Sequence, residues 1–177
     1  MKKLAEKTFM GGTFHYTHLR AGKVLGKWSS DNLVPEAGRL QIMDELFNGA
    51  AAIDGYILIY SNTATIADDL LYTDIGALKD LVEITDYASA TRPAWTSDGA
   101  AVPPGDVSNS AAKASFTFNQ DVASLGGAAY VSHANKGDEG GTVGGYLRAA
   151  SNLSSARTGI KSGDTIEIQY DFACTST

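Results

Sequence analysis

The chain has 177 residues, a formal net charge of −6 and 44% hydrophobic residues. These values fit one folded domain with a sizeable core and exclude a disordered chain, a collagen-like chain or a coiled-coil rod. The single cysteine, Cys174, allows no internal disulfide, so packing has to stabilise the fold. Charge is unevenly distributed, because residues 1–30 carry a net +5 and the remaining residues −11.

The amino end is predicted to form a basic arm over residues 1–11, followed by a single β-sandwich domain over residues 12–177. Gly11-Gly12 predicts a hinge-like break between the two. Segments 13–20 and 23–28, rich in β-branched, aromatic and other apolar residues, then predict two strands that form a hairpin. The basic N-terminal part of the chain therefore ends in a two-stranded ribbon.

One short α-helix is predicted near residues 35–48. Leu40, Met43, Leu46 and Phe47 recur at helical spacing, which predicts an apolar stripe that packs on another element. The next apolar run, residues 56–60, predicts a fully buried strand. It is the longest strongly apolar run and falls far short of the roughly 20 residues that a membrane helix needs, so no membrane partner is expected.

The segment from residue 61 to residue 110 is predicted to be a long loop excursion. Its polar stretches surround short apolar runs, of which 81–84 is a candidate strand. Arg92-Pro93 and Pro103-Pro104 exclude a continuous helix or central strand there. Long ordered loops in a compact domain usually serve contacts or a site.

The last third of the chain shows clear strand patterns over residues 114–119, 128–132, 146–149 and 166–172, separated by turn residues. In the last of these segments the apolar residues alternate with polar ones, which predicts one buried face and one wet face. Short strands, turns and one helix together predict a mainly β protein, an antiparallel β-sandwich of jelly-roll or Greek-key type.

Residues that could carry chemistry form no catalytic, cofactor or metal constellation in this sequence. His15 and His18 lie three apart in a predicted strand, so they point to opposite faces and cannot share a metal ion without a bulge. His133 has no nearby Cys or His partner. Cys174 lies in a Thr/Ser-rich tail that offers no activating base. We therefore expect no enzyme.

Adjacent acids and a glycine-rich loop leave one minor alternative open. The pairs Asp44-Glu45, Asp68-Asp69 and Asp138-Glu139 fit no calcium-loop pattern and are typical of solvated surfaces. The loop 137–145 lacks the lysine of a phosphate-binding loop, so a mobile β–β connection is the main interpretation and an ion site there the minor one.

The order of elements resembles small virion structural proteins of tailed bacteriophages, over roughly residues 22–172. Short motifs carry the resemblance, in chain order: Trp28, Asn32-Leu33-Val34, Gly38, Leu46-Phe47, Tyr56-Ile57-Leu58-Ile59-Tyr60, Tyr87, Arg92-Pro93, Ser108-Asn109-Ser110, Gly126-Gly127-Ala128-Ala129-Tyr130-Val131-Ser132 and Ser162-Gly163-Asp164-Thr165-Ile166. The resemblance implies a jelly-roll-like capsid decoration or cement protein on the capsid exterior of the virion, made in the host cytoplasm. It implies no catalytic residues.

A protein of that type would bind the major capsid protein and is expected to be a homo-oligomer. Nucleic acid is not expected as a partner, because the acidic body would repel phosphates. The candidate partner interface combines basic residues of the arm and ribbon with the two tryptophans: Lys2, Lys3, Lys7, Arg20, Lys23, Lys27, Trp28 and Trp95. For the basic arm, a solvated terminus is the competing interpretation; for each tryptophan it is cover for the core.

Two other functions stay open at this stage. A tail, collar or fibre-attachment protein of the same virion would use the same kind of β domain. A carbohydrate-binding β-sandwich is suggested by Trp95, Tyr87 and Asp86, since a sugar stacks on an exposed aromatic ring.

Overall fold

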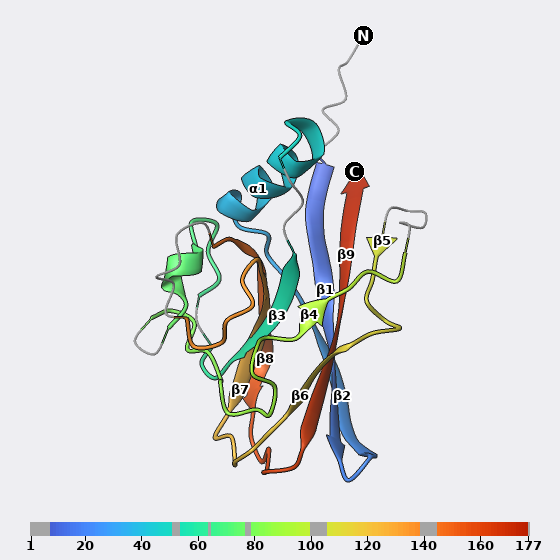
Figure 1. The fold of residues 1–177 in the computed structure, drawn as a ribbon, viewed down its shortest axis with the longest axis vertical. Helices are drawn as coiled ribbons and strands as arrows, with labels where there is room; N and C mark the ends of the chain where they lie inside the picture. The colour runs from blue at the N-terminus through green and yellow to red at the C-terminus, as the bar shows by residue number, and fades with distance from the viewer. Residues whose placement is uncertain are drawn as a thin grey trace.

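The computed structural model describes residues 8–50, 54–63, 65–76, 79–99, 106–138 and 145–176. Within them the chain forms two antiparallel β-sheets and one α-helix (Figure 1). The elements are β1 (Thr8–Arg20), β2 (Lys23–Asp31), α1 (Glu36–Phe47), β3 (Gly55–Tyr60), the 3₁₀ turn η1 (Tyr72–Asp74), β4 (Ala94–Trp95), β5 (Asp106–Val107), β6 (Ala114–Thr117), β7 (Leu125–Val131), β8 (Leu147–Arg157) and β9 (Thr165–Ser176). The predicted mainly β, sandwich-like class is confirmed.

The first sheet has the order β2-β1-β9, and both β5 and β6 pair with the other edge of β9; the second has the order β4-β3-β7-β8. β1 and β9 form the longest ladder, from Thr8 opposite Ser176 to Leu19 opposite Thr165. The predicted alternation in β9 is confirmed, because Ile166, Ile168 and Tyr170 are fully buried. Their side chains join those of both sheets in the main core.

The predicted hinge at Gly11-Gly12 is wrong, because β1 continues through both glycines and pairs with β9. A Cβ atom on Gly12 would lie 2.1 Å from the carbonyl oxygen of Asp171. This glycine therefore permits a close approach between strands instead of breaking one. Gly126 and Gly127 also lie inside β7, which begins before the predicted strand 128–132.

The segment after β3 covers the outer face of the second sheet. Leu58 and Tyr60 point to that face and pack with Leu70 and Ile75 in a second core cluster, whereas Ile57 and Ile59 belong to the main core. β3 is therefore buried on both faces, as its unbroken apolar run predicted.

The candidate strand 81–84 is wrong in detail. Leu81 bridges to Ile75 and Glu83 bridges to Tyr60, and each is a single bridge outside the named strands. The excursion therefore contributes single bridges here and the two-residue strands β4 and β5 further along the chain.

A buried ion pair holds this covering segment in place. The guanidinium of Arg92, 1% exposed, donates two hydrogen bonds of 2.8 Å to the carboxylate of Glu83. It also donates to the Tyr72 hydroxyl and to the carbonyl of His133. Burial alone would lower the pKa of Arg92, but the hydrogen bonds and charge of Glu83 outweigh it and raise that pKa. The middle of the chain is therefore a structural layer tied to the loop after β7.

Candidate functional site

The predicted apolar stripe of α1 faces solvent, contrary to the prediction that it packs on another element. Leu40, Met43, Leu46 and Phe47 are 60%, 42%, 67% and 73% exposed. We call these four residues the α1 surface. Large apolar side chains grouped on one helix face are typical of a contact site for another protein.

The other face of α1 is held on the sandwich by small and polar residues. Gly38 lies against β8, since a Cβ atom there would come within 2.6 Å of the Arg148 carbonyl oxygen. Arg148 donates hydrogen bonds of 2.7 Å to Gln41 Oε1 and the Tyr130 hydroxyl, and one of 2.8 Å to Glu45 Oε1. This polar anchor turns the apolar side of the helix outward.

An apolar hollow of about 170 Å³ adjoins this anchor, between α1 and the open end of the two sheets. Its lining includes Ile42, Trp95, Val107 and Phe172. Burial raises the pKa of Tyr130, which borders the same hollow, although the charge of Arg148 opposes that shift. The phenol therefore stays neutral near neutral pH and serves as a hydrogen-bond acceptor, not as a base.

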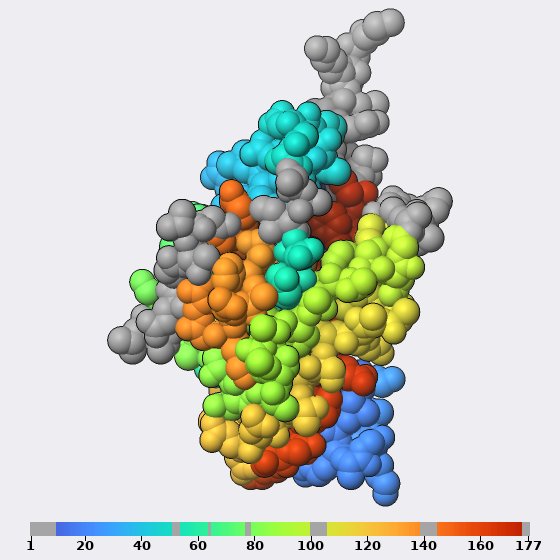
Figure 2. Space-filling view, in the orientation of Figure 1, coloured from blue at the N-terminus to red at the C-terminus, as the bar shows by residue number. Residues whose placement is uncertain are grey.

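The tip of the β1–β2 hairpin is the second exposed apolar feature. The turn is confirmed at Ala21 and Gly22, whose φ angles of 47° and 75° give the left-handed pair typical of tight hairpins. Val24 and Leu25 just beyond it are 53% and 52% exposed. Figure 2 shows the hairpin at the end of the molecule opposite α1.

Of the predicted basic interface residues, Arg20 is already engaged within its own chain. It donates hydrogen bonds of 2.7 and 2.8 Å to the carboxylate of Asp164, and His18 Nε2 lies 2.8 Å from the same carboxylate. The hydrogen bonds from Arg20 are the main reason that the pKa of Asp164 lies well below its usual range. Lys23 and Lys27 are exposed and form no ion pair with the described residues. Lys2, Lys3 and Lys7 lie outside those residues.

Both predicted interface tryptophans are half-buried against the main core. The ring of Trp28 stacks on Tyr16 with centroids 6.2 Å apart, and the guanidinium of Arg157 lies 5.1 Å from it. Trp95 packs on Tyr130 and donates from Nε1 to the Tyr170 carbonyl at 3.2 Å. Contacts within the chain therefore bury part of each tryptophan side chain.

The three histidines each meet a different carboxylate. His15 lies 3.0 Å from Asp171, on the face of β1 opposite to buried His18, as the spacing predicted. His133 lies 3.7 Å from Asp138. Across the described ranges, no group of three His, Cys, Asp or Glu residues is placed to hold a metal ion.

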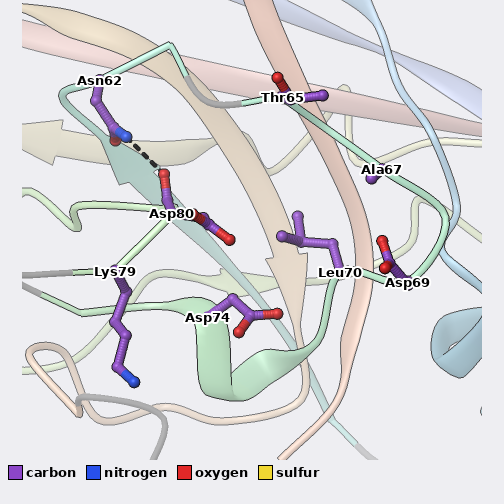
Figure 3. A pocket seen from close by; sticks show the side chains of 8 residues that line it. All are labelled: Asn62, Thr65, Ala67, Asp69, Leu70, Asp74, Lys79 and Asp80. Atoms are coloured by element: carbon purple, nitrogen blue, oxygen red, sulfur yellow. Dashed lines mark hydrogen bonds between the residues drawn. The ribbon is translucent and has the colours of Figure 1, made fainter.

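An acidic hollow of about 450 Å³ lies in the covering segment (Figure 3). Its wall includes Asp69, Asp74, Lys79 and Asp80, while the Asn62 amide donates to the Asp80 carbonyl. Asp74 also accepts a hydrogen bond from the Leu71 amide, which caps η1. Figure 3 shows the three carboxylates spread around the rim, so they do not converge on one point.

Comparison with protein-family models, with curated proteins and with solved structures found no match. The fold defines the chain as a mainly β protein with two antiparallel sheets and one helix. No helix among the described residues is both long and apolar enough to span a membrane.

Proposed function

We propose that this chain is a non-enzymatic structural protein of a tailed-bacteriophage virion, of the capsid decoration or cement type, which binds the outer shell and stabilises contacts between capsomers. The α1 surface is the observation that carries the proposal, because a rigid helix that exposes four large apolar side chains is built for contact with protein. The resemblance of the sequence to phage virion proteins supports the particular setting.

The two exposed surfaces lie at opposite ends of one β scaffold, a suitable arrangement for a protein that touches more than one neighbour. Each contact is small, so useful strength comes from repetition over an ordered array. The lysines of the arm are proposed to bind an acidic surface of the major capsid protein.

Quantitative mass spectrometry of purified virions tests the setting. A copy number comparable to that of the major capsid protein supports shell decoration, whereas a few copies per particle favour a tail, collar or fibre-attachment protein. Absence from the particle would refute the virion proposal altogether.

A second measurement tests the proposed role of the arm. The described ladder between β1 and β9 begins at Thr8, after the arm lysines in the sequence, so the test changes none of its residues. Replacing Lys2, Lys3 and Lys7 with glutamine should lower capsid occupancy and weaken its salt dependence. Unchanged occupancy and salt dependence would refute the role of these charges.

Sugar binding keeps one supporting observation. Trp95 borders the apolar hollow, although Tyr87 is 1% exposed and presents no ring to a ligand. Quenching of tryptophan fluorescence by a saccharide, lost in Trp95→Phe, would favour this second function.

A further inference from the structure

We propose that copies of this chain associate head to tail, with the hairpin tip of one copy docked on the α1 surface of the next. The hairpin tip consists of Lys23, Val24, Leu25 and Lys27. The inference rests on the proposed function in treating α1 as a contact surface, and it adds the partner: a second copy of the same chain.

The position of the two surfaces determines the kind of assembly. α1 and the β1–β2 hairpin lie at opposite ends of the long axis (Figures 1 and 2). One copy can therefore use both surfaces at once, each with a different neighbour. Such a heterologous contact produces rings or open chains, unlike a two-fold dimer in which one patch meets itself.

The charges around the two apolar patches are opposite. Exposed Glu36 and Asp44 accompany the α1 surface, while exposed Lys23 and Lys27 bracket the apolar pair of the hairpin tip. The remaining charge on the outer side of the helix, Arg39, is paired with Asp68 at 2.6 Å. Docking of the hairpin tip on α1 would therefore bring lysines to carboxylates. A contact between two α1 surfaces would bring like charges together, so the hairpin tip of a second copy is the favoured partner.

The spans of the two charged pairs are similar. Glu36 and Asp44 are eight helical residues apart, about 12 Å along the axis at 1.5 Å per residue. Lys23 and Lys27 lie opposite Arg20 and Thr17 across a bulge, so they are about 10 Å apart at 3.3 Å per residue. Val24 and Leu25 lie between the two lysines; on α1, Leu40 and Met43 lie between the two acids, and Leu46 and Phe47 follow Asp44 directly. The same docking can therefore bring the apolar and the ionic groups together.

The contact is small, which sets the conditions of the test. α1 has 12 residues and is therefore about 18 Å long. One face of so short a helix buries less area than a standard protein interface does. Association should therefore be weak and should increase with concentration.

Sedimentation velocity of the purified full chain, from about 5 to about 500 µM because a small contact binds weakly, tests the proposal. The hairpin variant carries Val24→Ser and Leu25→Ser, and the α1 variant carries Leu46→Ser and Phe47→Ser. Leu71→Ser is the matched control, since Leu71 is 46% exposed but belongs to neither surface. Circular dichroism verifies that each variant is folded.

We expect the wild type and the control to form species larger than dimers as concentration rises, and each variant alone to stay monomeric. An equimolar mixture of the two variants should form a dimer and nothing larger, because each supplies the surface that the other lacks and the outer ends are both blocked.

A hairpin variant that self-associates like the wild type would overturn the proposal, because α1 would then dock elsewhere. A mixture that stays monomeric, or a wild type that is monomeric at every concentration, would overturn it as well. These outcomes leave the virion copy number untouched, so the failure of this inference is distinct from the failure of the proposed function.

Discussion

Replacing Arg148 with methionine should loosen α1 from the sandwich. The Arg148 side chain is 6% exposed, and its hydrogen bonds to Gln41, Tyr130 and Glu45 join α1 to β7 and β8. Methionine keeps the apolar stem but removes the cation beside Glu45. Losing one partner of a buried pair costs about 3–5 kcal/mol, and because Glu45 is 18% exposed and can regain water, we expect a loss of about 3 kcal/mol.

Urea unfolding measures the total loss, and hydrogen exchange shows where it occurs. Amides of α1 should exchange faster in Arg148→Met while those of β3 and β9 keep their order of protection. Arg39→Met is the matched control on the same helix. Its pair with Asp68 is exposed at both partners, so the expected cost is below about 1 kcal/mol. Equal effects of the two substitutions would refute the anchoring role of Arg148.

Three further predictions concern stability. Arg20 keeps the pKa of Asp164 low, so ionised Asp164 contributes fully to the free energy of unfolding above about pH 5, and this contribution is lost as the pH falls through and below about 4. Urea midpoints of Asp164→Asn should therefore vary less than those of the wild type across that range. Gly38→Ala should destabilise the protein, although the same change in a free helix interior gains about 1 kcal/mol, because its Cβ would meet β8 backbone; a gain in urea stability would contradict this. Phe47→Ser should change the free energy of unfolding by less than about 0.5 kcal/mol, and a loss near 3 kcal/mol would mean that Phe47 is core.

Local patterns predicted the elements that depend on local chemistry. The alternation in residues 166–172 predicted which side of β9 is buried, and the turn at Ala21-Gly22 predicted the hairpin. The helix was predicted within a residue at either end. In each case the signal and its structural cause lie within a few neighbouring residues.

Features that depend on residues distant in the sequence were harder to predict. Gly12 looks like a hinge in the sequence, but its reason is the Asp171 carbonyl, more than 150 residues away. The pairing of Arg92 with Glu83 gave no sequence signal, because nothing near either residue marks it as buried. A segment with few apolar residues could therefore still become a covering layer, because Leu70, Tyr72, Ile75 and Leu81 pack on the sheet. The ion pair of Arg92 with Glu83 holds the loop in place.

The orientation of α1 shows why the candidate site could not be predicted from periodicity. The spacing of Leu40, Met43 and Phe47 does define one helix face, and in an isolated domain such a face normally packs inward. What reverses it is a competing face with Gly38, which permits backbone contact, and with Gln41, which meets the buried guanidinium of Arg148. Close approach and charge-assisted hydrogen bonds hold that face on β8, so the apolar stripe is left outward. A helix held by its polar side leaves an apolar surface exposed, and a repeated contact between proteins requires such a surface.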